Sequence, residues 1–255
     1  MGKIICVGTH KGGSGKTTIS TNIAFGLALK NKSVCLIDID GQSNVATTLG
    51  INNTDNVNHS LLSVCLKEIE LPEVVKPIND VLDIIYADYS MNLFDHYANK
   101  DKKVLSNYLK ILEHLKNIYD YLVIDMSPSL SLLNFKTLSV ADELILPFSM
   151  DRQDIQGMIS FLEELEDSKY KHLVKVMLAN KYTNRFSIDK KIVSEAELLS
   201  TKFKNTKIFN TKIPNSSLFK KIPLTENVPL IVSKSNSKQT LQQKEIINNL
   251  LNEIM

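Results

Sequence analysis

The chain has 255 residues, of which 43% are hydrophobic and 23% are charged, values typical of a globular protein with a sizeable core. Its 30 basic and 28 acidic residues give a net charge of +2, which excludes a uniformly basic nucleic-acid binder and leaves only a local patch for such contacts. The three cysteines fit no metal or disulfide pattern, so we expect a cytoplasmic protein. No apolar run approaches ~20 residues, so we expect no membrane span. The length fits one domain over residues 1–255.

A glycine-rich segment between an apolar strand and a helical pattern is the strongest feature of the sequence. The strand is expected at 2–9 and the helix at 18–30. Glycines let backbone N–H groups approach a phosphate, and a helix N-terminus adds free N–H groups and a positive dipole end. We therefore expect a phosphate-binding loop rather than an ordinary glycine-rich loop, with Lys16 reaching the β- and γ-phosphates and the Thr17 hydroxyl binding Mg²⁺. The expected nucleotide-binding residues here are Lys11, Gly12, Gly13, Ser14, Gly15, Lys16, Thr17 and Thr18.

This loop departs from the usual pattern at its start. His10 stands where a phosphate loop ordinarily has Gly, and a second lysine, Lys11, follows it. Lys11 comes too early in the loop to duplicate Lys16. We expect Lys11 to be free to reach a phosphate on another nucleotide, for example one bound by a facing subunit.

Two carboxylates follow the second expected strand, residues 33–37. A period of two puts Asp38 and Asp40 on the same side, and ligands of open α/β sheets sit at the carboxyl ends of strands. Asp40 is then placed to orient an attacking water, which makes it a candidate catalytic residue beside Lys11 and Lys16. Asp38 is placed to help hold Mg²⁺. The alternative is that Asp40 caps the next expected helix, residues 42–49, and the two roles do not exclude each other.

The middle of the chain continues the alternation of strands and helices. After an Asn-rich loop at 52–60, an apolar strand at 121–125 ends in Asp125, the pattern of a strand that holds Mg²⁺ through its carboxylate. The following residues, 127–134, are expected to form the loop that senses the γ-phosphate. The other expected elements are helices at 60–68, 102–117, 151–165 and 240–254, strands at 81–86, 143–147 (ended by proline) and 174–179, and a helix ending at Lys204. This order predicts an α/β fold with one doubly wound, mostly parallel sheet and helices on both faces.

Three stretches resemble the ParA family of partition ATPases in its short, Soj-like form. They are Lys-Gly-Gly-x-Gly-Lys-Thr-Thr at 11–18, Asp-x-Asp-x-Gln-x-Asn followed by Thr-Thr-Leu-Gly-Ile at 38–51, and the run at 120–130. The family belongs to the deviant-P-loop group that includes MinD and nitrogenase iron protein. The chain departs from the usual family residues at Ser14, Gly41, Met126, Ser127 and Asn215.

The resemblance implies an Mg²⁺-dependent ATPase that segregates plasmid or chromosomal DNA. ATP would join two subunits face to face, with Lys11 crossing to the partner's phosphates, and the dimer would bind DNA without sequence preference. A ParB-like centromere-binding protein would stimulate hydrolysis and release the DNA, which implies a nucleoid-associated location. The family implies no separate N-terminal helix-turn-helix domain. It also implies that Asn180 and Pro214 border the nucleotide base, although Asn180 also suits a simple turn.

Basic side chains in the second half of the chain are the expected DNA contacts. Spread lysines neutralise phosphates without reading bases, although each one alone also suits a solvated surface. The family places such residues after Tyr182. The expected DNA-binding residues are Arg185, Lys190, Lys191, Lys220 and Lys221.

The alternative function is a membrane-associated positioning ATPase like MinD, which ends in a basic amphipathic helix. The terminal helix expected at 240–254 carries Glu245 and Glu253 against Lys244 alone. We therefore expect this helix to pack on the sheet and not on a membrane.

Overall fold

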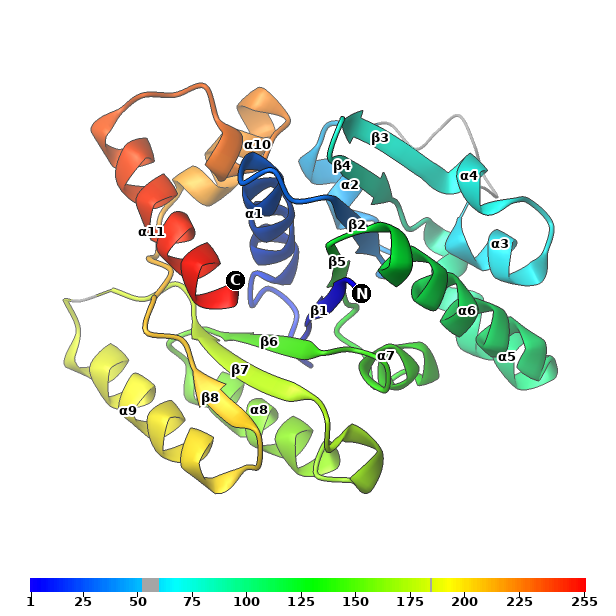
Figure 1. Ribbon diagram of the computed structural model, residues 1–255. Coiled ribbons are helices and arrows are strands. Elements are labelled where there is room, and N and C mark those ends of the chain that lie inside the picture. The colour runs from blue at the N-terminus through cyan, green and yellow to red at the C-terminus, as the bar shows by residue number, and fades with distance from the viewer. Residues whose placement is uncertain (52–59, 184) are drawn as a thin grey trace.

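The computed structural model describes residues 1–51, 60–183 and 185–255 (Figure 1). The strands in this part of the chain are β1 Lys3–Val7, β2 Val34–Asp38, β3 Val75–Asn79, β4 Leu82–Ile85, β5 Tyr121–Asp125, β6 Glu143–Phe148, β7 Val174–Ala179 and β8 Thr206–Ile208. The α-helices are α1 Lys16–Leu29, α2 Asn44–Thr48, α3 Leu61–Leu66, α4 Leu71–Val74, α5 Phe94–Lys100, α6 Lys102–Ile118, α7 Leu132–Leu138, α8 Arg152–Glu164, α9 Ser187–Lys202, α10 Leu218–Glu226 and α11 Lys238–Ile254. Short 3₁₀ helices lie at Tyr89–Leu93, Ser168–Tyr170 and Leu230–Val232. All of the loop expected at 52–60 except Ser60 lies outside the described residues.

The described strands form one sheet in the order β3-β4-β2-β5-β1-β6-β7-β8. All neighbouring pairs are parallel except β3 with β4, which is antiparallel. Helices lie around the sheet (Figure 1), and the doubly wound α/β fold expected from the sequence is confirmed.

The apolar run of β1 shows why the sheet is covered on both faces. Successive side chains of a strand point to opposite faces. Ile4 and Cys6 accordingly join the core shared with α3 and α5–α9, whereas Ile5 and Val7 join the core shared with α1 and α11. Because all four are buried, neither face of the strand tolerates polar residues, which is the composition expected of a central parallel strand.

The register of the central strands places the expected site residues at one edge. Asp125, at the end of β5, pairs with Val7 of β1 on one side and with Asp38 of β2 on the other. The glycine-rich segment follows directly after β1. The carboxyl ends of β1, β2 and β5 therefore bring the loop and both carboxylates together, as the order of elements predicts.

Three expected boundaries are wrong. β6 does not end at Pro147, which pairs with Leu178 of β7. On the other side of β6, the pairing with β1 extends only to Ile145. Because proline lacks an N–H group, it is tolerated here, where no hydrogen bond to β1 is lost. The loop expected at 127–134 is shorter, because α7 begins at Leu132 after the Ser131 hydroxyl caps it. The helix expected at 42–49 shrinks to Asn44–Thr48, because Ser43 has a left-handed backbone.

Three elements have little signal in the sequence. β3 lies at an edge of the sheet, contains a proline and is mostly exposed, so it has neither an apolar run nor alternation. β8 has only three residues. α10 contains Pro223, which ordinarily argues against a helix interior.

The terminal helix α11 packs against α1 (Figure 1), and its buried residues share one core with strand residues of the sheet, as expected. Leu251 of α11 lies where a side chain on Gly26 of α1 would be, so the two helices approach closely at that glycine. In the part of the chain that the structure describes, no helix combines the length and apolarity needed to cross a bilayer.

We predict that Gly26→Ala lowers the free energy of unfolding by about 0.5–2 kcal/mol, because the overpacked contact with Leu251 (about 1–3 kcal/mol) outweighs the gain in helix propensity (roughly 0.5–1 kcal/mol). Gly157→Ala is the matched control: a Cβ on this helical glycine of α8 meets nothing within 4 Å, so improved helix propensity raises stability by roughly 0.5–1 kcal/mol. Urea denaturation measures both. Equal shifts in the two variants would contradict the proposed α1–α11 contact.

Candidate nucleotide-binding site

The segment that joins β1 to α1 is an open loop whose shape depends on glycine. Gly13 and Gly15 have φ angles of 76° and 94°, in the left-handed region that side chains disfavour. At Gly15 a Cβ would also collide with the amide of Asn180. A Cβ on Gly12 or Gly13 would meet nothing within 4 Å, so the outer face of the loop is open to a ligand.

Lys16 begins α1 and is only 7% exposed. Its ammonium donates a hydrogen bond to the carbonyl oxygen of Lys11 at 3.1 Å, across the mouth of the loop. Burial lowers the pKa of Lys16, and Asp125 and Asp40 oppose that shift through their charge. The lysine therefore lies inside the loop as a cation that an anion would stabilise.

Thr17 and Asp125 are in direct contact. The Thr17 hydroxyl donates to Asp125 Oδ2 at 2.7 Å, while the buried Asp125 Oδ1 has no hydrogen-bond partner among the described residues. Burial raises the pKa of Asp125 to about 7. A buried carboxylate oxygen without a partner is destabilising unless a cation or a proton binds it.

Asp38 and Asp40 lie side by side, as the period of two predicts. Asp38 is fully buried and accepts hydrogen bonds from the backbone N–H groups of Asp40 (2.9 Å) and Val45 (3.2 Å). Burial and the nearby charge of Asp125 raise the pKa of Asp38 well above its usual range. The expected alternative, capping of the next helix by Asp40, is wrong: Asp40 Oδ1 accepts from Gln42, and the first-turn N–H of Val45 goes to Asp38.

The arrangement of Thr17, Asp38 and Asp125 fits a magnesium ion. Within residues 1–51, 60–183 and 185–255, no group of three or more His, Cys, Asp or Glu forms a complete metal site. Mg²⁺ in a nucleotide site is ordinarily held by one or two carboxylates together with phosphate oxygens and water. The unpartnered Asp125 Oδ1 and the adjacent Thr17 hydroxyl supply oxygens of the right kind.

A cavity of about 690 Å³ opens beside the loop. Nearly all the expected nucleotide-binding residues line it, including Asn180 and Pro214. Lys11 and Ser14 do not; Ser14 is buried, and its carbonyl oxygen accepts a hydrogen bond from the Asn180 amide at 2.6 Å. The sequence reasoning missed several lining residues, namely Gln42, Asn44, Pro128, Lys181, Asn215, Ser216, Ser217 and Phe219.

Lys11 is not free, contrary to expectation. Its ammonium lies 2.9 Å from Asp151 Oδ2 and 2.5 Å from Asp154 Oδ1, at the N-terminus of α8. These bonds raise the pKa of Lys11 and lower that of Asp151. Nothing in the sequence marks Asp151 as more than a helix cap, a role that it also fills by accepting from Gln153.

The expected DNA-binding residues are exposed but do not form one cluster. Arg185, Lys190 and Lys191 lie just before or in the first turns of α9, and Lys220 and Lys221 lie in α10. Figure 1 shows these helices at different ends of the molecule. Lys220 also lines the cavity beside the loop, a position that the sequence did not predict.

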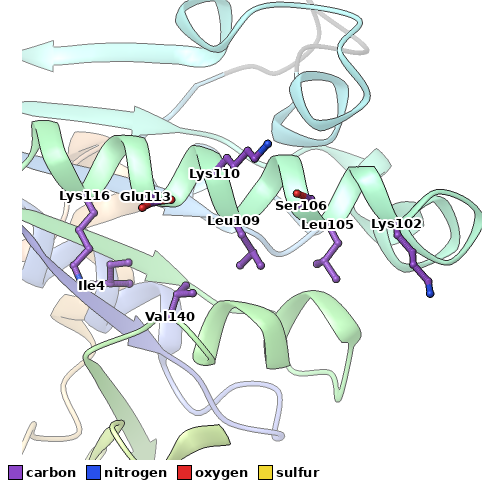
Figure 2. A pocket seen from close by; sticks show the side chains of 9 residues that line it. All are labelled: Ile4, Lys102, Leu105, Ser106, Leu109, Lys110, Glu113, Lys116 and Val140. Atoms are coloured by element: carbon purple, nitrogen blue, oxygen red, sulfur yellow. The ribbon is translucent and has the colours of Figure 1, made fainter.

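A second cavity, of about 600 Å³, runs along α6 (Figure 2). Leu105, Leu109 and Val140 lie along it, and Lys116 binds Asp142 at 2.7 Å beside it. No glycine-rich turn contributes to its described lining. The cavity beside the loop differs from it in having glycines of the loop in its lining.

The loop between β1 and α1, the lysine that begins α1 and the aspartate that ends the adjacent strand define a P-loop nucleoside triphosphatase. A family model described as an AAA domain matches residues 2–179, and a ParA family protein of Mycoplasma pneumoniae is 26% identical over 270 residues, with 98% of this chain and 97% of that protein covered. The chain belongs to the ParA family of P-loop ATPases. The sporulation initiation inhibitor protein Soj of Bacillus subtilis is 32% identical over 163 residues, which is 64% of each chain.

Solved structures share the fold. McdA from Cyanothece superposes with a TM-score of 0.80 at 19% identity and full coverage of both chains. A putative plasmid partition protein from Borrelia burgdorferi, bound to AMPPNP, has a TM-score of 0.75 at 20% identity and covers 99% of this chain and 100% of its own. Both likenesses concern the arrangement of the chain in space.

We predict that Asp125→Asn stabilises the nucleotide-free protein increasingly as the pH rises. The pKa of Asp125 is raised in the folded state, so the folded protein holds a proton that the unfolded chain releases between pH about 4 and 7. The wild type thus loses stability through that window by at most about 1.4 kcal/mol per pH unit, whereas an amide does not titrate. Urea denaturation at pH 5, 6, 7 and 8 measures the difference.

Asp80→Asn, which removes a charge at an exposed turn, is the control for this measurement. Parallel stability curves for Asp125→Asn and the wild type would show that Asp125 does not carry the raised pKa.

Proposed function

We propose that this ATPase partitions DNA and that it binds ATP with Mg²⁺ in the cavity beside the loop. One observation carries the proposal: Lys16, Thr17 and Asp125 meet where β1, β5 and α1 come together, with one carboxylate oxygen left for a cation. The chromosome-partitioning proteins among its relatives and the bound AMPPNP of a structural neighbour support it.

The loop would bind the phosphates through backbone N–H groups and Lys16. Because Lys16 already points into the loop, a phosphate would replace the Lys11 carbonyl oxygen as its partner without a large movement. Thr17 and Asp125 would hold Mg²⁺ directly, and Asp38 would help to hold it indirectly. The ion would neutralise charge on the β- and γ-phosphates.

Asp40 would position the attacking water. It borders both the main cavity and a smaller one of about 390 Å³ that contains Ser127, Pro128 and Ser129. It is 8% exposed, so it can contact a single ordered water while bulk solvent stays outside. The loop of Ser127–Ser129 is held by the Asn134 amide, which donates to the carbonyl oxygens of Ser127 and Ser129.

Two subunits would close on ATP, with Lys11 exchanging Asp151 and Asp154 for phosphate oxygens of the facing subunit. The closed dimer would join the basic residues of two chains and bind DNA without sequence preference. A ParB-like partner would then stimulate hydrolysis, and the location would be the nucleoid. Ile247, Leu250, Leu251 and Ile254 of α11 are buried in the core shared with α1, and Leu241 is the only large apolar residue of this helix that is exposed, which argues against the MinD-like alternative.

We predict that DNA binding requires ATP. A fluorescent duplex titrated with ATP, ADP or no nucleotide, at two salt concentrations, should be bound tightly with ATP only, and Lys16→Ala should abolish that difference. Each lysine occurs twice in the dimer, so the log–log salt slope should fall by about two when one phosphate-contacting lysine per chain is reversed and by about four when two are reversed. Lys190→Glu with Lys191→Glu tests α9, and Lys221→Glu tests α10 without altering the cavity lining.

Binding that is indifferent to nucleotide would refute the proposed switch. An unchanged salt slope in both sets of variants would show that the DNA contacts lie elsewhere.

We predict that Lys11→Ala binds ATP but no longer dimerises. The side chain of Lys11 does not line the cavity beside the loop, so the loss of its ammonium removes the cross-subunit contact and the ion pairs with Asp151 and Asp154 but no contact within that cavity. Light scattering with ATP should report a monomer, whereas the wild type should double in mass. Lys16→Ala, which should lose nucleotide binding as well, is the comparison. A Lys11→Ala dimer of normal affinity would exclude the cross-subunit role.

A further inference from the structure

Lys181, which the sequence reasoning did not single out, contacts the phosphate loop. It follows Asn180 at the end of β7, and its ammonium donates to the carbonyl oxygen of Gly13 at 2.7 Å. The Asn180 amide donates to the next carbonyl, that of Ser14, at 2.6 Å. Two consecutive residues after β7 therefore donate hydrogen bonds to two consecutive carbonyl oxygens of the loop.

The backbone around Lys181 is built for this contact. Lys181 has a φ of 56°, a left-handed conformation that is uncommon for a residue other than glycine and that persists where the surroundings fix it. The next residue, Tyr182, donates to Ile213 and accepts from Asn215, both at 3.0 Å. The chain after β7 is thus anchored to residues 213–215, and the direction of the Lys181 side chain follows from that anchor.

The side chain of Lys181 borders the cavity. Lys181 follows β7 by two residues, its ammonium lies at the loop, and it lines the cavity together with Pro214 and Phe219. A lysine stem packs on apolar surface while its ammonium makes a polar contact. The face of a purine ring in this cavity would be such a surface.

We propose that Lys181 binds nucleotide in two ways: its ammonium fixes the phosphate loop through Gly13, and its methylene stem packs on the base. This inference rests on the proposed function and adds a base-contacting residue to it. It also assigns the two functions to different parts of one side chain, which makes them separable by substitution.

Lys181→Met keeps an unbranched apolar stem and removes the ammonium, whereas Lys181→Ala removes both. Isothermal titration with ADP should show about tenfold weaker binding for Lys181→Ala, from a lost charged hydrogen bond and a lost contact, and roughly threefold for Lys181→Met. Titration with tripolyphosphate, which has no base, should show the same modest loss for both variants. The difference between the two variants therefore isolates the stem.

Lys67→Ala is the matched control, because Lys67 is also exposed and left-handed (φ 62°) but lies after α3, outside the cavity. It should bind ADP like the wild type, and unchanged melting temperatures verify folding. Wild-type ADP affinity in Lys181→Ala would overturn the proposal. A Met–Ala difference that persists with tripolyphosphate would overturn the base contact. A wild-type protein that binds neither ligand would overturn the proposed function itself, a result that no Lys181 variant can mimic.

Discussion

The phosphate loop must keep its shape while no anion binds it, and side-chain hydrogen bonds to its carbonyl oxygens provide that constraint. Lys16, Asn180 and Lys181 donate to the carbonyls of Lys11, Ser14 and Gly13. These hydrogen bonds fix the carbonyl oxygens of the loop before an anion binds. Such preorganisation reduces the ordering that binding would otherwise require. The requirement also explains why the end of β7, distant in sequence, belongs to the site.

The hydrogen bonds to the loop stabilise the protein without a ligand, whereas the carboxylates at the ends of β2 and β5 destabilise it. Asp38 and Asp125 are buried side by side, and burial raises the pKa of each. Keeping the two acids together lowers the free energy of unfolding, because an apolar pair would pack there without the cost of burying carboxyl groups. A bound cation would relieve the repulsion between the two carboxylates. The pair that destabilises the protein without a cation would therefore favour binding of one. Stability and nucleotide binding are therefore linked through these two groups.

The sequence predicts the parts of the site that lie within one strand and its following turn. Strand β1, the loop and α1 are contiguous, and the apolar runs that end in Asp38 and Asp125 carry their own signal. The contacts of Lys11 with α8 and of Lys181 with the loop carry no such signal, because each joins residues that are far apart in the sequence. The sequence did not predict β3 for a related reason: this exposed edge strand takes its conformation from its pairing with β4 and not from a pattern of its own.

The position of Lys11 shows how a triphosphate and a diphosphate would have different effects in the proposed dimer. In the single chain, Asp151 and Asp154 already satisfy the Lys11 ammonium, and Asp154 is nearly buried. A facing nucleotide must offer enough negative charge to replace two carboxylates, and the γ-phosphate adds that charge. Removal of the γ-phosphate would return Lys11 to α8. The competition between α8 and the facing phosphates for one ammonium is thus a physical basis for a dimer that forms on ATP and separates after hydrolysis.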